Sequence, residues 1–216
     1  MNFEIAAHAI VEIGKRLYQK NLLAAADGNI SCRLEDGTIL ITPSGMPKGF
    51  ITIDDLALIS QKGEVIKGRP SSETPMHLQI FNSCFQAKFV IHAHPPTAVA
   101  WSIAFPQDTS LPSSAMSEMI LALGELPIVP YARPGTADMA TNLLPYLPKR
   151  RAMVLARHGA LSWGETMQEA LNGMERIEHC AQMLYLAKQL GGITHLPQDE
   201  INYLKQCRER LGDKNL

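Results

Sequence analysis

The sequence predicts an α/β fold in which helices cover a mixed sheet and residues 1–216 form one domain. Strand-like segments are separated partly by hairpin-like turns and partly by helical segments, the pattern of a mixed sheet packed against helices. The chain has 216 residues, of which 46% are hydrophobic. It shows no internal repeat, low-complexity tract or linker, so a single core is expected.

The first half of the chain begins with an amphipathic helix over residues 3–20, where Ile5, Ala9, Ile13 and Leu17 form one stripe. Four short strands are expected next, and the turn Glu35-Asp36-Gly37 joins the first two. These strands are residues 30–34, 38–42, 56–60 and 64–66. The segment Ser71-Ser72-Glu73-Thr74-Pro75 then predicts a helix that runs to about Cys84, with a hydroxyl N-cap and Pro75 in the first turn.

The second half opens with a buried strand at residues 89–91, which ends at His92-Ala93-His94. Apolar runs predict two further strands, at 127–131 and 152–156. Helices are expected after Pro96 to about Ala104, and at 117–123, 136–147, 166–190 and 198–211, the last two being the longest.

Charge and composition exclude several classes of partner. The formal net charge is −1, and Lys149-Arg150-Arg151 is the longest basic run, so neither nucleic acid nor an anionic membrane is indicated. No apolar stretch reaches the roughly 20 residues of a membrane-spanning helix, and the N-terminus lacks the pattern of a signal peptide. The four cysteines are widely spaced and are expected to be buried thiols. We therefore expect a cytoplasmic protein.

Histidines at strand ends predict a metal site. Side chains two apart on a strand point the same way, so His92 and His94 project together from the end of the strand at 89–91. His158 follows the strand at 152–156 and precedes Gly159, which permits close approach. Three imidazoles with an open position are typical of a catalytic zinc site. The alternative is that these are ordinary strand-end histidines.

Glu73 is the candidate acid–base group, because a carboxylate beside a dication keeps a low pKa and can move a proton once substrate displaces it. The alternative is a first-turn glutamate favoured by the helix dipole. His77, one turn later, either bonds Glu73 or packs within the helix.

Three segments at element boundaries combine glycine with hydroxyl or amide groups, which suits the binding of a phosphate. They are Asp27-Gly28-Asn29, Thr42-Pro43-Ser44-Gly45 and Ser71-Ser72. Each alone is also typical of an ordinary turn. No P-loop or Gly-x-Gly-x-x-Gly motif is present, so nucleotide binding is not indicated.

In this order, the strings Gly28-Asn29-Ile30-Ser31, Thr42-Pro43-Ser44-Gly45, Ser71-Ser72-Glu73, His92-Ala93-His94 and Arg157-His158-Gly159 resemble the class II aldolase/adducin family. Pro130-Tyr131 and Pro134-Gly135-Thr136 are also similar to it. The resemblance covers about residues 5 to 190 and is strongest to its L-fuculose-1-phosphate aldolases.

The resemblance implies α/β/α layers around a mostly antiparallel sheet, in a homotetramer with active sites between subunits. It implies that Glu73, His92, His94 and His158 bind Zn²⁺, with Mn²⁺ or Co²⁺ as alternatives, and that Glu73 is also the catalytic acid–base. It further implies a phosphate site made by Gly28, Asn29, Ser44, Gly45, Ser71 and Ser72. The implied reaction is cleavage of L-fuculose 1-phosphate or a 5-deoxy-ketose 1-phosphate to dihydroxyacetone phosphate and a small aldehyde.

One departure from the family concerns a catalytic tyrosine. In the family, a neighbouring subunit contributes this tyrosine, which protonates the substrate oxygen that belongs to the aldehyde fragment. Its counterpart falls near Met116, Ser117 or Glu118, where no tyrosine stands. We expect Glu118 to replace it as a catalytic residue, and the alternative is that another residue serves. Related members with the same site are sugar-phosphate epimerases, decarboxylases and methylthioribulose-phosphate dehydratases, and these remain alternatives. A non-catalytic adducin-like binding module is a second alternative, but such modules lack the metal ligands.

Overall fold

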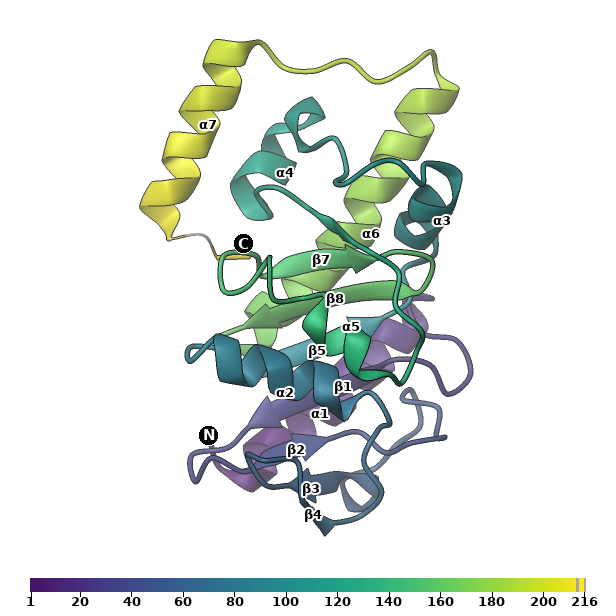
Figure 1. The fold of residues 1–216 in the computed structure, drawn as a ribbon, viewed down its shortest axis with the longest axis vertical. Helices are drawn as coiled ribbons and strands as arrows, with labels where there is room; N and C mark the ends of the chain where they lie inside the picture. Colours follow the sequence, from purple (N-terminus) through teal and green to yellow (C-terminus); the bar gives the residue numbers. More distant parts are fainter. Residues whose placement is uncertain (213, 216) are drawn as a thin grey trace.

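The computed structural model describes residues 1–212, 214 and 215, and these residues contain one eight-stranded sheet (Figure 1). The strand order is β4-β3-β2-β1-β5-β8-β7-β6. Every neighbouring pair is antiparallel except β6 and β7, which are parallel. The predicted fold class, with its mostly antiparallel sheet, is therefore confirmed. The strands are β1 (Asn29–Arg33), β2 (Ile39–Ile41), β3 (Ala57–Ile59), β4 (Val65–Lys67), β5 (Phe89–Ala93), β6 (Ile128–Val129), β7 (Ala152–Leu155) and β8 (Gly159–Gly164).

Helices cover both faces of the sheet (Figure 1). Side chains of α1, α3 and α6 share one hydrophobic cluster with one face of the sheet, and side chains of α2 and α5 share a second cluster with the other face. A third, smaller cluster joins α4 to α7. The helices are α1 (Phe3–Gln19), α2 (Thr74–Ser83), α3 (Pro96–Ala104), α4 (Ser117–Ala122), α5 (Ala137–Thr141), α6 (Met167–Gln189) and α7 (Gln198–Leu211), with short 3-10 turns at Ile53–Asp55 and Ser113–Ala115.

The central strand β5 shows how the sheet directs its side chains. Phe89, Ile91 and Ala93 lie in the cluster beneath α1 and α6, whereas Val90 lies in the cluster beneath α2. This alternation places His92 on the same side as Val90 and α2. The face that carries His92 is therefore the face on which α2 begins.

The structure differs from the sequence prediction at three of these elements. The helix expected at 136–147 is α-helical only over Ala137–Thr141, and turns follow it. Residues 159–164 were not predicted as a strand, but they form β8, which inserts between β5 and β7. The start of α2 was expected to carry a hydroxyl N-cap. Instead Glu73 occupies the N-cap position and makes no side-chain cap hydrogen bond, because its carboxylate is turned toward the histidines described below.

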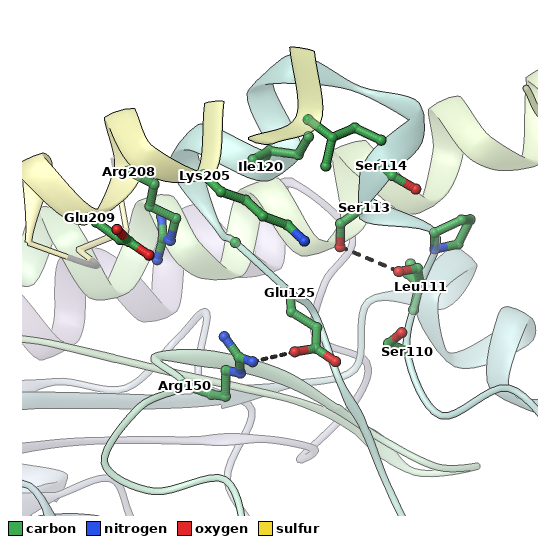
Figure 2. Close-up of a pocket in the computed structure, with 13 residues that line it drawn as sticks. Ser110, Leu111, Ser113, Ser114, Ile120, Glu125, Arg150, Lys205, Arg208 and Glu209 are labelled. Atoms are coloured by element: carbon green, nitrogen blue, oxygen red, sulfur yellow. Dashed lines mark hydrogen bonds and ion pairs between the residues drawn. The ribbon is translucent and has the colours of Figure 1, made fainter. Parts of the chain in front are cut away.

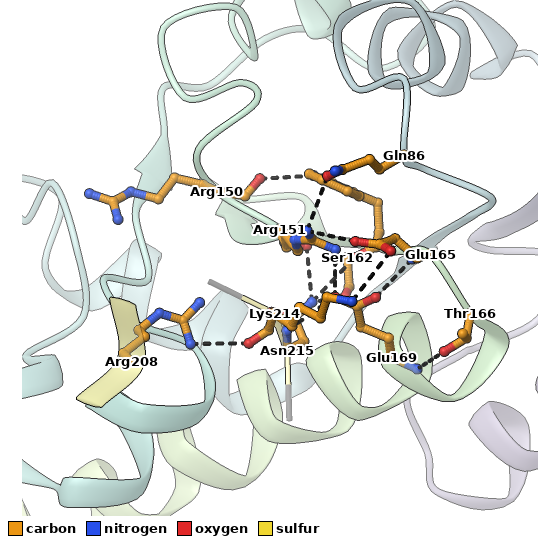
Figure 3. Close-up of polar contacts among 11 residues, drawn as sticks. Gln86, Arg150, Arg151, Ser162, Glu165, Thr166, Glu169, Arg208, Lys214 and Asn215 are labelled. Atoms are coloured by element: carbon orange, nitrogen blue, oxygen red, sulfur yellow. Dashed lines mark hydrogen bonds and ion pairs between the residues drawn. The ribbon is translucent and has the colours of Figure 1, made fainter. Parts of the chain in front are cut away.

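A buried polar cluster anchors the C-terminal residues to the sheet (Figure 3). The guanidinium of Arg151 donates to Glu169 at 2.7 Å and to Glu165 at 3.0 Å, and it stacks on the Trp163 ring. The backbone N–H of Asn215 donates to the Glu169 carboxylate at 3.3 Å, so the end of the chain joins the same network. We call the side chains of Arg151, Glu165, Glu169 and Asn215 the arginine cluster.

Two features are absent from the described part of the chain, a membrane-spanning helix and a disulfide bond. No helix among residues 1–212 is both long enough and apolar enough to cross a membrane. All four cysteines are free thiols, as expected from their spacing, but only three of them are buried, because Cys207 is partly exposed.

Candidate metal centre and substrate cavity

Three histidines from two separate segments converge at one end of the central strands. His92 is in β5, His94 follows that strand, and His158 lies in the turn between β7 and β8. The centroids of the three rings are each 4.9 Å from the other two. One ring nitrogen from each lies within 4.8 Å of the others, so the three could hold a metal ion.

Local backbone structure explains how His158 reaches the other two rings. The turn that carries it places Arg157 at φ +60, and Ser102 of α3 accepts the N–H of Arg157 at 2.8 Å. A Cβ atom on Gly159 would lie 2.7 Å from the His92 ring and 2.9 Å from the His94 ring. Only glycine leaves room for both rings at that position.

The hydrogen bonds of the rings direct two lone pairs at the same point. His92 donates from Nδ1 to the carbonyl of Ala160 at 2.9 Å, and Nδ1 of His94 is 3.4 Å from the Asp27 carboxylate. Each ring then presents an unprotonated Nε2, and these two atoms are only 3.1 Å apart. Such second contacts fix the tautomer of metal-binding imidazoles in general.

The protonation states agree with a ligand role. Burial lowers the pKa of His92 to about 3, and burial followed by the charge of His158 lowers the pKa of His94. Both rings are therefore neutral near pH 7, the form that binds a metal. Neutral imidazoles whose lone pairs face one another fit a divalent transition ion.

Glu73 completes this cluster. Its carboxylate oxygens lie 3.1 Å from Nε2 of His158 and 3.3 Å from Nε2 of His92, and the Asn29 amide donates to one of them at 2.7 Å. Burial on its own raises the pKa of Glu73. The hydrogen bond with His158, the charge of His92 and the Asn29 amide lower that pKa by more, so the net direction is well below the ordinary value.

A buried chain of hydrogen bonds holds the Asn29 amide in one orientation. A carboxylate can only accept, so Asn29 donates its NH₂ to Glu73 and its oxygen accepts from Nε2 of His77. The other ring nitrogen of His77 then accepts from the Ser31 hydroxyl at 2.6 Å. His77 thus binds Ser31 and Asn29 rather than Glu73, and no sequence signal distinguished these possibilities.

Beside the histidines is a cavity of about 460 Å³. All six residues of the predicted phosphate site line it, together with Glu73, His94 and His158. The six are Gly28, Asn29, Ser44, Gly45, Ser71 and Ser72. The structure thus brings three distant segments together within one cavity.

Gly28 and Gly45 have backbone conformations that side chains disfavour, with φ of +70 and +75. A Cβ on Gly28 would also lie 2.7 Å from the carbonyl oxygen of His92. A Cβ on Gly45 would meet no atom within 4 Å, so that part of the turn faces open space. Gly28 is therefore required for packing, and Gly45 for the shape of the turn.

Two further charged residues line the cavity. Asp27 belongs to one of the three segments predicted to suit a phosphate, whereas sequence reasoning did not assign Lys48 to the site. Asp27 contacts His94, as described above. Lys48 is almost wholly buried, with 2% of its surface exposed, and donates to the carbonyl of Ala26 at 2.5 Å.

Glu118 lies apart from these groups. It is in α4, where its carboxylate accepts from the Ser117 hydroxyl at 2.9 Å, and it does not line the cavity. A second cavity, of about 540 Å³, lies between α4 and α7 (Figure 2). There Arg150 pairs with Glu125, and Lys205 extends from α7 into the space. None of the predicted site residues lines this second cavity.

Comparison with known proteins identifies the family. The family model described as "Class II Aldolase and Adducin N-terminal domain" matches residues 8–185. A 3-oxo-tetronate 4-phosphate decarboxylase of Pectobacterium atrosepticum is 31% identical over 89% of this chain and 88% of its own length. A 5-deoxy-D-ribulose 1-phosphate aldolase of Bacillus thuringiensis is also 31% identical, over 95% of this chain and 96% of its own length.

Solved structures show the same fold. YgbL from Escherichia coli superposes with a TM-score of 0.88 at 29% identity, covering 94% of this chain and 99% of its own. The L-fuculose-1-phosphate aldolase from Thermus thermophilus superposes with a TM-score of 0.77 at 29% identity, covering 88% and 98%.

Proposed function

The chain belongs to the class II aldolase and adducin family, and we propose that it is a zinc-dependent aldolase. Its substrate would be a 5-deoxy-ketose 1-phosphate or L-fuculose 1-phosphate, cleaved to dihydroxyacetone phosphate and a small aldehyde. The observation that carries this proposal is the convergence of His92, His94 and His158 beside Glu73, at the edge of the 460 Å³ cavity. The Bacillus relative, similar over nearly the whole of both chains, supports the 5-deoxy-ketose.

The metal centre would consist of the three imidazoles, with Glu73 as a fourth ligand before substrate arrives. Zinc is the usual ion at such nitrogen-rich sites. A divalent ion bound there would supply a Lewis acid for the negative charge that develops on substrate oxygen. The six glycine, asparagine and serine residues that line the cavity would hold the phosphate, through backbone N–H groups and hydroxyls.

Cleavage of the carbon–carbon bond needs two proton movements. One proton leaves the hydroxyl on the aldehyde side, and another is added to the carbon that remains with the phosphate-bearing fragment. Glu73 is placed for the second step. Its low pKa keeps it ionised at rest, so it first takes up a proton from solvent and then delivers that proton to the carbon. The proton removed from the hydroxyl returns to solvent, so no net proton is gained or lost. Asn29 and His77 would keep the Glu73 carboxylate oriented during the transfer to carbon.

The first proton requires another group, and we assign it to Glu118 of a neighbouring subunit. Glu118 lies outside the cavity of its own chain, so it could reach a site only in an assembly. This assignment implies a homotetramer with active sites between subunits, in which residues 1–216 act as one catalytic domain. We further propose that the enzyme works in the cytoplasm.

The second candidate reaction is decarboxylation of a 3-oxo acid that carries a phosphate. Several relatives have this activity in their names, including the Pectobacterium protein. Loss of carbon dioxide leaves the same three-carbon fragment and still needs Glu73 to add a proton to carbon. It needs no proton removal from a hydroxyl, so Glu118 would have no role. A dehydratase or a binding module has less support, since the metal ligands are complete and no relative described above carries those names. The description of the YgbL structure names epimerase together with aldolase and decarboxylase, so an epimerase remains a further alternative.

A product assay separates the two candidate reactions. The purified enzyme is given 5-deoxy-D-ribulose 1-phosphate or 3-oxo-tetronate 4-phosphate, and the second product is measured as well as dihydroxyacetone phosphate, which both would yield. We expect acetaldehyde from the first substrate, and a loss of that activity in Glu118→Gln. Carbon dioxide from the second substrate, with no aldehyde from the first and normal turnover by Glu118→Gln, would replace the aldolase by a decarboxylase.

A further inference from the structure

Lys48 is a buried cation with unused hydrogen-bonding capacity. An ammonium group has three N–H donors, and within residues 1–212 only the carbonyl of Ala26 accepts from it. The side chain is 2% exposed and nevertheless lines the cavity. Two donors therefore remain for a group that enters the cavity.

No carboxylate forms an ion pair with this ammonium within the described part of the chain. Asp27 is bound to His94, and Glu73 is bound to His158 and Asn29. Burial lowers the pKa of Lys48, and the charges of Asp27 and Glu73 offset this only in part, because Lys48 forms no ion pair with either of them. Removing an ammonium from water is costly unless a counter-ion is supplied. The described residues place no carboxylate in direct contact with the ammonium, which points to a counter-ion from outside.

The surroundings of Lys48 favour an anion. The hydroxyls of Ser44 and Ser72 line the same cavity and have no hydrogen-bond partner among the described residues. The turn at Gly45 faces open space, as shown above. Hydroxyl donors, an open glycine turn and an ammonium together match the oxygen atoms of a phosphate group.

We infer that Lys48 provides the positive charge of the substrate site, and that it selects the phosphate monoester dianion over an uncharged sugar. This inference rests on the proposed function for the identity of the substrate, but not for the binding of phosphate itself. It changes the picture that the sequence predicted, because the six phosphate-site residues from the sequence are all uncharged.

A structural role for Lys48 is the competing explanation. Its bond to Ala26 ties down a turn in which Ala25 has φ +44, a conformation that costs energy. Two substitutions separate these roles. Lys48→Gln removes the charge but keeps a donor for the Ala26 carbonyl, whereas Lys48→Met removes both the charge and the donor.

The test is calorimetric titration of the purified metal-loaded enzyme with inorganic phosphate. We expect Lys48→Gln and Lys48→Met to weaken phosphate binding by similar factors, about 10- to 100-fold, the range for a charge-assisted hydrogen bond. The control Lys67→Gln removes the same charge from an exposed lysine of β4 and should bind phosphate as the wild type does. Thermal unfolding of each variant verifies that it is folded.

Enzyme kinetics supply a second readout. With the phosphorylated ketose, Lys48→Gln should raise KM about 10- to 100-fold and change kcat by only a few-fold, because the lost contact is remote from the bond that breaks. Slow turnover of the unphosphorylated ketose should be unaffected by the substitution. Neither result is expected if Lys48 only supports the turn at Ala25.

Three results would overturn the inference. They are wild-type phosphate affinity in Lys48→Gln, a loss of affinity in Lys48→Met alone, and an absence of measurable phosphate binding to the wild type. Failure of the proposed function is a different result, in which no ketose 1-phosphate is cleaved while phosphate binding still depends on Lys48.

Discussion

Two buried polar clusters in this molecule use similar groups in opposite ways. In the arginine cluster, each charged group faces one of opposite sign, so Arg151 meets Glu165 and Glu169, and the backbone N–H of Asn215 meets Glu169 (Figure 3). We call His92, His94, His158 and Glu73 the histidine cluster. In it, the unprotonated Nε2 atoms of His92 and His94 face each other, 3.1 Å apart. The charges of the first cluster are paired within the chain, whereas the second cluster suits a cation.

This difference separates stability from function. A buried ion pair that is satisfied by its own chain fixes the position of the elements that carry it, here β7, α6 and the C-terminal residues. A cluster of acceptors that face acceptors contributes little to stability on its own, and its geometry is explained by what it binds. Substitutions in the two clusters should therefore have different consequences.

The largest effect is expected on turnover from Glu73→Gln. The amide keeps the shape of the side chain but cannot move a proton, so kcat should fall about 10²- to 10⁴-fold. The metal content and the thermal midpoint should remain close to those of the wild type, and elemental analysis and calorimetry measure both. Turnover within a few-fold of the wild type would remove Glu73 from the chemistry.

In the arginine cluster, Arg151→Met should reduce the free energy of unfolding by about 3–5 kcal/mol, because it leaves the buried Glu169 without its partner. Urea denaturation measures this, and kcat of the folded enzyme should be unchanged. Arg150→Met is the matched control at the next position. Its ion pair with Glu125 is largely exposed, so its removal should cost less than about 1 kcal/mol. Equal losses in the two variants would contradict the distinction drawn here.

A third effect concerns the pH dependence of stability through His77. Burial lowers the pKa of His77 to about 4, below the value of about 6.5 expected in the unfolded chain. As pH falls, the unfolded chain binds the proton first. The contribution of His77 to the free energy of unfolding is therefore complete above about pH 6.5 and is lost as the pH falls toward 4. This contribution is at most about 3 kcal/mol.

Denaturation of the wild type and His77→Gln between pH 7 and 4 measures this effect. The variant is expected to be less stable at pH 7 but to lose less stability on acidification. Parallel curves would show that His77 is not a buried neutral imidazole.

The smallest effect is expected from Asn215→Ala. The Asn215 side chain makes three long hydrogen bonds of 3.3 to 3.4 Å, and its buried oxygen has no partner among the described residues. Removal of the Asn215 side-chain amide should lower the free energy of unfolding by about 1 kcal/mol without changing kcat. A loss as large as that of Arg151→Met would mean that the C-terminal residues contribute more than their contacts indicate.

The sequence predicted most of the fold because its apolar periods agree with the elements that form. Residues 3–19, 167–189 and 198–211 are helical within a residue or two of expectation. It missed β8, because Gly159 and Gly164 bound a six-residue run that has the composition of a loop. The pairing of β8 with β5 and β7 is a tertiary effect that overrides this local composition.

Local sequence was informative for site residues that follow the period of a strand or mark a turn. His92 and His94 share a strand end, and Gly28 and Gly45 mark turns, so their proximity to the site could be expected. The position of Lys48 could not be expected, because its buried ammonium binds the carbonyl of Ala26, which belongs to a separate segment earlier in the chain. The bonds of His77 to Ser31 and Asn29 likewise join segments that are more than 40 residues apart.

Elemental analysis tests most directly whether the histidine cluster binds a metal ion. The wild type and the double variant His92→Ala/His94→Ala are purified from medium containing zinc and then dialysed without a chelator. We expect about one zinc ion per wild-type chain and almost none in the double variant, with both proteins folded. A wild type without stoichiometric metal, or a double variant with the wild-type content, would contradict the metal centre.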